Sequence, residues 1–348
     1  MDKQILLNTI KCLLADDKGL LAMDESIDTC NKRFAALGIP QTVEARRSFR
    51  EWIVTTPGLN ESISGAILFD ETIRQQTKDG IPFTKVLEKA GIIPGIKVDL
   101  GAKNMAGFPD EKITEGLDGL HNRLEEYAKL GARFAKWRAV ITIDDGIPTD
   151  ACINGNAHAL ARYAALCQDT GIVPVVEPEV LMDGNHTLQR CYDVTDKVLR
   201  ALFNQLYSQK IFLEGMLLKP NMIIAGKDAA SQNSIDEVAK ATVDCLLQSV
   251  PAAVPGIAFL SGGQSPQQAT EHLNAINKNF KFRLPWVLTF SFSRAIEHPA
   301  IDIWHGQEAN VAKAQRSLYH RAKCNAAARR GEYKTSMEKE LEGESIKW

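Results

Sequence analysis

The sequence predicts an α/β fold: a single-domain (β/α)8 or TIM barrel with an N-terminal helix and a C-terminal helical extension. Three observations support this prediction. The chain contains eight short, nearly continuous apolar runs, each run ends in polar or charged residues, and amphipathic helical stretches follow the runs. Apolar strands that alternate with helices are typical of a parallel sheet covered by helices, and eight such units favour a closed barrel.

The elements are predicted in order along the chain. Apolar positions at helical spacing predict a first helix over residues 3–15. The predicted strands cover residues 19–23, 64–69, 92–96, 132–135, 172–176, 213–218, 256–260 and 286–290. The clearest further helices cover residues 119–130, 156–167, 189–207, 234–249, 266–276 and 306–330. No Pro/Ser/Gly-rich linker divides the chain, so residues 1–330 are expected to form one barrel domain and residues 331–348 a mobile, charged tail.

An open, doubly wound sheet is the main alternative fold. Such a sheet usually carries a Gly-x-Gly-x-x-Gly motif directly after its first strand. Here the first predicted strand is followed by Asp24-Glu25-Ser26 instead, which favours the barrel.

Composition and charge exclude several classes of protein. The chain has 348 residues, of which 45% are hydrophobic, and a formal net charge of -2, which argues against nucleic acid or a membrane surface as its main partner. No apolar run approaches the ~18 residues of a transmembrane helix, and the N-terminal residues lack the pattern of a secretory signal. The seven cysteines form no C-x-x-C pair, so we expect free thiols in a reducing compartment, either the cytoplasm or the plastid stroma of a processed protein.

The polar residues that end the strands are the candidate functional residues. In a barrel, the carboxyl ends of the strands open onto a common mouth. These ends carry Asp24, Asp70, Lys97, Lys136, Arg138, Glu177, Glu179, Lys219, Ser261, Gly262 and Arg294. Each residue alone is compatible with the surface, and Asp24-Glu25-Ser26 with a helix cap. Several lysines and carboxylates at one mouth nevertheless indicate a catalytic site.

Lys219 is the central candidate. It follows the apolar residues 213–218, in which Gly215 allows close backbone approach, and Pro220 then ends the strand. Burial and neighbouring lysines lower the pKa of a lysine, and a neutral lysine attacks carbonyl groups to form a Schiff base. Nearby carboxylates can carry protons through the carbinolamine and imine steps. The alternative is a lysine that only ends a strand and extends its ammonium to water.

The glycine-rich turn Ser261-Gly262-Gly263-Gln264-Ser265 is a candidate phosphate site. The backbone N–H groups of such a turn, at the start of a helix near Pro266, suit a phosphate. Arg294, at the end of the next strand, would add a charged contact, and the loops after strands seven and eight of a barrel often bind phosphate. The alternative is a turn whose glycines serve only backbone geometry.

Motifs for other chemistries are missing from the sequence. The seven histidines show no H-E-x-x-H or paired-ligand spacing, and there is no P-loop and no G-x-S-x-G elbow. We therefore expect neither a metal nor a cofactor.

Six motifs make the chain similar to a known family. They are LAMDES (21–26), GIKVD (95–99), FAKWR (134–138), VVEPE (175–179), LLKPNM (217–222) and FLSGGQS (259–265). With them, the chain resembles the class I, Schiff-base-forming fructose-1,6-bisphosphate aldolases over nearly its whole length. The LAMDES form and TTPG (55–58) look most like the plastid and cyanobacterial branch of that family.

The resemblance implies a role for each catalytic candidate. Lys219 would attack the C2 carbonyl of fructose 1,6-bisphosphate, and Glu177 would move the protons that let water leave the carbinolamine. Asp24 would take the C4 hydroxyl proton as the C3–C4 bond breaks. Lys136 would hold Asp24 and the substrate hydroxyls, and Glu179 would tune the lysine cluster. The products would be dihydroxyacetone phosphate and glyceraldehyde 3-phosphate, formed without a metal.

The resemblance also implies two phosphate sites and an assembly. The C1 phosphate would be held by Ser261, Gly262, Gly263 and Arg294. The far phosphate would be held by Ser26, Thr29, Lys97 and Arg138. The expected partners are a sugar bisphosphate and further copies of the chain in a homotetramer. The sequence leaves the preference between fructose and sedoheptulose bisphosphates open.

Three positions depart from the family pattern. Animal members end in a tyrosine that assists protonation of the enamine, whereas this chain ends in Trp348. Ser293 stands where glycine or alanine is frequent before the arginine, and its hydroxyl is expected either to crowd the phosphate or to contact it. Leu100 replaces a common lysine, which removes one positive charge near the far phosphate.

Two other functions would keep the barrel but change its chemistry. A pyridoxal-phosphate enzyme would also form a lysine imine, but no partner for the pyridine nitrogen can be chosen from the sequence. A binding scaffold without catalysis would lack a catalytic residue, whereas all four main candidates are present: Asp24, Lys136, Glu177 and Lys219.

Overall fold

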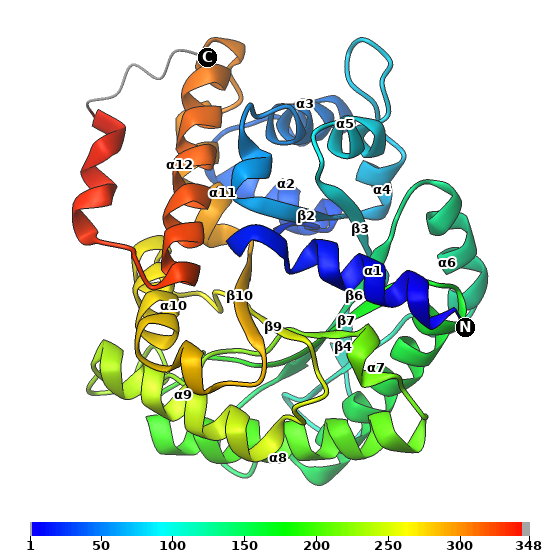
Figure 1. The fold of residues 1–348 in the computed structure, drawn as a ribbon, viewed down its shortest axis with the longest axis vertical. Helices are drawn as coiled ribbons and strands as arrows, with labels where there is room; N and C mark the ends of the chain where they lie inside the picture. Colours follow the sequence, from blue (N-terminus) through cyan, green and yellow to red (C-terminus); the bar gives the residue numbers. More distant parts are fainter. Residues whose placement is uncertain (1, 343–348) are drawn as a thin grey trace.

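A closed parallel barrel organises the computed structural model, which describes residues 2–342 (Figure 1). Its eight strands pair in the order β1-β10-β9-β8-β7-β6-β3-β2, and β1 pairs with both β10 and β2. Their bounds are β1 (Gly19–Met23), β2 (Ile63–Leu68), β3 (Ile93–Lys97), β6 (Phe134–Ile141), β7 (Val173–Val180), β8 (Leu217–Leu218), β9 (Gly256–Phe259) and β10 (Val287–Phe292). The predicted (β/α)8 barrel is confirmed.

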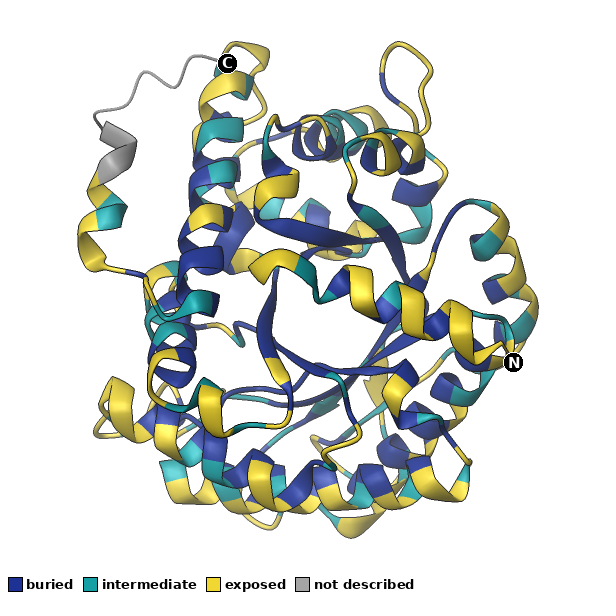
Figure 2. Ribbon diagram, viewed as in Figure 1, coloured by how far each residue is buried: buried dark blue, intermediate teal, exposed yellow. Residues whose placement is uncertain are grey.

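Helices surround the barrel and turn their apolar faces towards it, so that buried and exposed residues alternate along each helix (Figure 2). Their bounds are α1 (Lys3–Leu13), α2 (Ile27–Ala36), α3 (Val43–Val54), α4 (Asp70–Ile73), α5 (Phe83–Lys89), α6 (Leu120–Lys129), α7 (Asp150–Asp169), α8 (Leu188–Ser208), α9 (Ile235–Ser249), α10 (Pro266–Phe280), α11 (Arg294–Trp304) and α12 (Val311–Arg330). All the predicted helices are present. Helix α7 begins before its predicted start at residue 156 because the Thr149 side chain caps it by accepting from the N–H of Cys152.

Strands β6 and β7 continue further than the sequence pattern predicts. Both run through the charged residues that were expected to end them, and Arg138 of β6 lies in register with Glu177 of β7. Charged side chains on neighbouring strands can pair with one another. The backbone pairing of β6 with β7 therefore does not have to end where the polar residues begin.

The stretch before Lys219 differs from the prediction of one strand over residues 213–218. Leu213–Gly215 forms a short 3-10 helix, and only Leu217–Leu218 forms β8. Burial of apolar side chains, on which the prediction rests, is the same in both conformations. Gly215 does permit close packing, because a Cβ there would lie 2.8 Å from the Phe212 ring. The N–H of Lys219 donates to the carbonyl of Val176 at 2.8 Å, which holds the lysine beside β7.

The amino end of the barrel is closed, which leaves the carboxyl end for a site. Helix α1 contributes Leu6, Ile10 and Leu13 to an apolar cluster with residues of the strands. The hydroxyl of Ser64, at the start of β2, donates to the carbonyl of Leu13 at 2.6 Å. Further inside, a Cβ on Gly19 would lie 2.5 Å from the ring of Phe290, so the filled interior requires glycine there.

Two segments outside the barrel complete the description. An antiparallel hairpin of β4 (Ala102–Asn104) and β5 (Lys112–Thr114) was not predicted, because three-residue strands leave no readable periodicity. After α12, Glu338 accepts hydrogen bonds from Arg321 and Tyr333. The mobility of residues 331–348 stays a prediction, and Trp348 lies outside the described residues.

The seven cysteines are all free thiols, and only Cys12 is exposed. Within the described residues, no helix is long and apolar enough to span a membrane.

Candidate active site

Four charged side chains form a continuous chain of contacts at the carboxyl end of the barrel. The Nζ atom of Lys219 lies 3.0 Å from Oε1 of Glu177. The other oxygen of Glu177 lies 2.9 Å from Nζ of Lys136, and the same Nζ donates to Oδ2 of Asp24 at 2.9 Å. Each of these residues is less than one-tenth exposed. The structure thus brings the four main catalytic candidates together.

The strand register places these side chains next to one another. Lys136 of β6 is opposite Val175 of β7, so Glu177 is its diagonal neighbour two residues further along. Asp24 directly follows β1, and Lys219 directly follows β8. The four groups therefore lie on, or directly after, four separate strands of the barrel.

The two buried lysines differ in their protonation. Burial lowers the pKa of Lys219; Glu177 opposes this effect, Lys136 adds to it, and the net shift is downward. Burial also disfavours the charge on Lys136, but Asp24 and Glu177 outweigh burial and raise its pKa. The opposite shifts favour the neutral amine at Lys219 and the cation at Lys136.

The carboxylates remain ionised for the complementary reason. Burial alone would raise the pKa of Asp24, but the charges of Lys136 and Lys219 lower it. The same two lysines, together with Arg138, lower the pKa of Glu177 against the effect of burial. Both groups can therefore accept a proton near neutral pH.

Glu179 has a different neighbour from the one expected. It forms an ion pair with the Nε of Arg138, and not with a lysine. Arg138 is itself held by its backbone N–H, which donates to Oδ2 of Asp99 at 3.2 Å. A direct effect of Glu179 on the lysine cluster is not visible in these contacts, so its catalytic role stays a prediction.

The glycine-rich turn and Arg294 lie side by side, as predicted. Gly262 and Gly263 have φ angles of 59° and 90°, a left-handed conformation that favours glycine. A Cβ on Gly263 would lie 3.5 Å from Nη2 of Arg294. In the described part of the chain, the N–H groups of both glycines have no hydrogen-bond acceptor. Two unpaired N–H groups beside a guanidinium are suited to bind an anion.

The residues predicted for the far phosphate are more dispersed. Ser26 caps helix α2, where its hydroxyl accepts from the N–H of Thr29 at 3.3 Å and lies 3.1 Å from the Thr29 hydroxyl. The helix-cap interpretation is therefore right for Ser26, while Asp24 faces Lys136. Lys97 forms an ion pair with Asp99 at 2.6 Å. None of these contacts tests phosphate binding.

Comparison with known proteins decides the family. A family model described as "Fructose-bisphosphate aldolase class-I" matches residues 5–347. The chain belongs to the class I fructose-bisphosphate aldolases. It is 55% identical over 335 residues to a probable fructose-bisphosphate aldolase class 1 of Xanthomonas campestris pv. campestris, with 96% of this chain and 100% of the relative covered.

Other relatives of this aldolase family member come from eukaryotes. Fructose-bisphosphate aldolase 4, cytosolic, of Arabidopsis thaliana is 49% identical, with 91% of this chain and 80% of the relative covered. A solved structure of fructose-bisphosphate aldolase from Plasmodium falciparum, in complex with TRAP and a small-molecule inhibitor, superposes with a TM-score of 0.93 at 46% identity and covers 95% of each chain.

A second charged cluster beside Asp24 was missed by the sequence analysis. One nitrogen of Arg33, Nη1, contacts both Glu25 and Glu297, the latter at 3.4 Å. The hydroxyl of Ser293 lies 3.3 Å from an oxygen of each of these two carboxyl groups. Ser293 therefore contacts the side chains of Glu25 and Glu297, an outcome that neither expectation for this position included. Glu297 lies one helical turn after Ser293, and this spacing could have indicated the contact.

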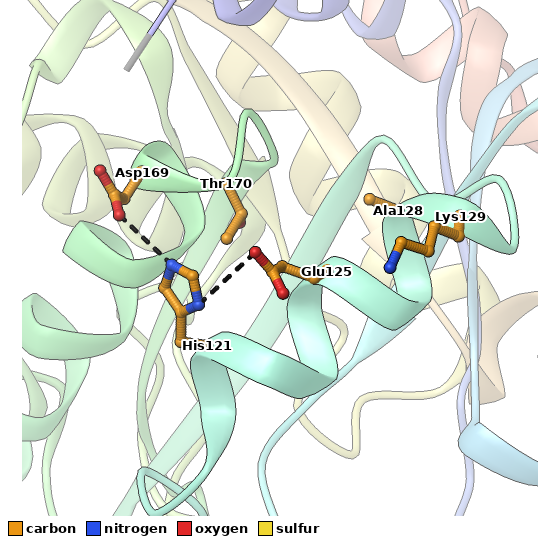
Figure 3. Close-up of a pocket in the computed structure, with 6 residues that line it drawn as sticks. All are labelled: His121, Glu125, Ala128, Lys129, Asp169 and Thr170. Atoms are coloured by element: carbon orange, nitrogen blue, oxygen red, sulfur yellow. Dashed lines mark ion pairs between the residues drawn. The ribbon is translucent and has the colours of Figure 1, made fainter.

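Two other groups of polar residues lie apart from the active site. Asp70, two residues after β2, begins α4 and binds Arg74 and Tyr127, not the charged residues of the site. A pocket of about 450 Å³ lies between α6 and the end of α7, where His121 extends between Glu125 and Asp169 (Figure 3).

One His/Cys/Glu group in the described residues has its ligand atoms within 4.8 Å of one another: His320, Cys324 and Glu338. It lies on α12 and the segment that follows. The carboxylate of Glu338 already accepts from Arg321 and Tyr333, so we assign no metal to it.

Proposed function

We propose that the chain cleaves fructose 1,6-bisphosphate reversibly to dihydroxyacetone phosphate and glyceraldehyde 3-phosphate through a Schiff base at Lys219. This reaction belongs to glycolysis, gluconeogenesis or the Calvin cycle. One observation carries the proposal: the buried 3.0 Å contact between Lys219 and Glu177, which continues through Lys136 to Asp24. Membership of the class I family supports the same chemistry.

Formation of the imine uses Lys219 and Glu177. The lowered pKa of Lys219 makes its neutral amine available, and the nitrogen lone pair forms a bond to C2 of the ketose. Glu177, next to Nζ, first takes the ammonium proton of Lys219. After the attack, one proton moves from the nitrogen to the former carbonyl oxygen, which gives the neutral carbinolamine. Glu177 then returns its proton to the carbinolamine hydroxyl, so that water leaves and a protonated imine remains.

Cleavage of the carbon–carbon bond uses Asp24. Its carboxylate would accept the C4 hydroxyl proton while the electrons of the C3–C4 bond move to the protonated imine and form an enamine. Lys136, at 2.9 Å, keeps Asp24 ionised for this step. Release of glyceraldehyde 3-phosphate, protonation of the enamine carbon and hydrolysis of the imine then return the free amine.

The phosphate contacts are part of the proposal. The glycine N–H groups and Arg294 would hold the C1 phosphate. The far phosphate would contact Ser26 and Thr29 at the start of α2, together with Lys97 and Arg138. The last two are paired with Asp99 and Glu179, so a phosphate would have to share or replace those partners.

Finer points of the function are also proposals. We propose a cytoplasmic homotetramer, which light scattering coupled to size-exclusion chromatography would test. The similarity of residues 21–26 and 55–58 to the plastid and cyanobacterial branch stays a prediction, since the relatives described above are bacterial, plant cytosolic and apicomplexan. We also propose that the same site accepts sedoheptulose 1,7-bisphosphate.

A coupled assay tests the proposal. The purified chain is expected to release both triose phosphates from fructose 1,6-bisphosphate at the same rate in the presence and absence of EDTA. Sedoheptulose 1,7-bisphosphate is assayed in parallel to define preference. Loss of activity with EDTA, or no release of triose phosphate, would overturn the proposed metal-free mechanism.

A further inference from the structure

A buried histidine lies behind the glycine-rich turn. His272, on the second turn of α10, is 2% exposed, and its Nδ1 lies 2.5 Å from Oε1 of Gln264. The Nε2 of Gln264 donates to the carbonyl of Ser261 at 3.0 Å, and the Gln264 N–H approaches the same carbonyl at 3.1 Å. A continuous chain of hydrogen bonds therefore joins helix α10 to the turn.

Hydrogen-bonding capacity fixes the direction of this chain. A backbone carbonyl only accepts, so the side-chain amide of Gln264 must present its NH₂ group to Ser261. Its oxygen is then the atom that faces His272, and Nδ1 of His272 must carry a proton. Burial lowers the pKa of His272 to about 4, so the ring is neutral and the donor is the Nδ1–H tautomer.

A cavity adjoins the turn and the histidine. It has a volume of about 210 Å³ and is lined by Met182, Ile224, Gln264 and His272 among others. A Cβ on Gly263 would lie 3.2 Å from the sulfur of Met182, so the cavity adjoins the turn itself. Packing around the turn is therefore incomplete on this side, and the hydrogen bonds from Gln264 and His272 are contacts that can fix its position.

We propose that His272 is a positioning residue for the phosphate-binding turn. It donates to Gln264, Gln264 holds the Ser261 carbonyl away from the mouth, and the N–H groups of Gly262 and Gly263 are thereby directed towards the anion. This inference rests on the proposed function, because it assigns the turn to the C1 phosphate. It adds a residue that touches neither the substrate nor the reacting groups.

Replacement of the donor tests the proposal. His272→Phe keeps a flat ring but loses the hydrogen bond, while His272→Asn keeps an N–H donor of shorter reach. A control is Asn277→Leu, on the same helix, where the buried amide donates, among the described residues, to the carbonyl of Leu273 alone. Borohydride trapping at Lys219 is measured as a function of dihydroxyacetone phosphate concentration, together with kcat and KM for fructose 1,6-bisphosphate.

We expect a loss of affinity without an equal loss of turnover. His272→Phe should raise KM and the half-saturating concentration for trapping about threefold to tenfold, the effect of one hydrogen bond, with kcat within about twofold of the native value. His272→Asn should restore much of the affinity, and Asn277→Leu should leave it unchanged. Unchanged half-saturation in His272→Phe, or a fall in kcat at constant KM, would overturn the inference.

Two further measurements distinguish a failure of the role proposed for His272 from a failure of the proposed function. Gln264→Glu loses the donor to Ser261 but keeps the size of the side chain, so it should reproduce the affinity loss even if His272→Phe fails to fold. Native affinity in Gln264→Glu would contradict the proposal. If the native protein is not trapped at all, the proposed function fails; if it is trapped and the variants titrate like it, only the role of His272 fails.

Discussion

The ammonium of Lys219 and the carboxylate of Glu177 lie 3.0 Å apart, and both residues are 3% exposed. Glu177 also contacts Lys136, so one carboxylate faces two lysines. Lys136 has a second anion in Asp24, whereas no other ion pair reaches Lys219 in the described chain. This asymmetry favours loss of a proton from Lys219 over loss from Lys136.

Replacement of Glu177 by glutamine should remove proton transfer to the carbinolamine. Glu177→Gln is expected to lower kcat by roughly 10²- to 10⁴-fold, the usual contribution of a general acid–base group. Steady-state kinetics measure the effect. Glu179→Gln is a matched control, because Glu179 contacts Arg138 and should cost less. Equal losses in both variants would contradict the assignment.

Loss of Lys136 should affect stability and activity together. Lys136→Met leaves the buried carboxylates of Asp24 and Glu177 without their shared cation, which is expected to lower the free energy of unfolding by about 3–5 kcal/mol. Burial is the main cause of the lowered pKa of Lys219, and the variant removes the further lowering by the charge of Lys136, so imine formation should slow. Urea denaturation and single-turnover trapping measure the two effects. A stable, fully active variant would be inconsistent with this network.

Arg294 should contribute to substrate binding more than to the chemical step. Arg294→Ala is expected to raise KM roughly 10- to 100-fold, since a charge-assisted hydrogen bond contributes about 1.5–3 kcal/mol. Arg294→Lys keeps the charge without the planar guanidinium and should give an intermediate KM. The measurement is kcat and KM for fructose 1,6-bisphosphate. An unchanged KM in the alanine variant would remove Arg294 from the phosphate site.

Glu297 should make stability depend on pH. Burial, and next the charge of Glu25, raise the pKa of Glu297 well above its ordinary value of 4.5. Between these two values the folded chain holds a proton that the unfolded chain has lost, so this stabilisation disappears as pH rises through the raised pKa. Glu297→Gln keeps a neutral side chain of similar shape and lacks this titration.

Unfolding in urea at several pH values, from about pH 5 to about pH 9, measures this effect. The native chain should lose stability relative to Glu297→Gln as pH increases. A constant difference between the two proteins across that range would show that Glu297 does not hold the extra proton.

Much of the fold follows from patterns that are local in the sequence. Residues 19–23 and 256–260 are short apolar runs of the kind that form buried strands. The observed strands agree with these predicted bounds within one residue. The stretch before Lys219 was assigned wrongly because burial pattern alone does not separate a 3-10 turn at Leu213–Gly215 from a strand. The end of β6 was placed too early because its charged side chains find partners on other strands.

The sequence predicts the position of a site residue where a charged side chain directly follows a strand. Lys219 and Asp24 each follow a strand directly, so topology alone brings them to the mouth. The contact between Arg33 and Glu297 joins residues far apart in the chain, and no local pattern indicates it. The link from His272 to Gln264 was missed for a related reason: both residues look like ordinary polar positions until a helix turn places them together.

The most direct test of the central claim is covalent trapping. The chain is incubated with dihydroxyacetone phosphate, reduced with borohydride and mapped by peptide mass spectrometry. A single adduct on the peptide that contains Lys219, absent from Lys219→Met, is the predicted result. Trapping on another lysine, or cleavage of fructose 1,6-bisphosphate by Lys219→Met at near-native rate, would contradict the account.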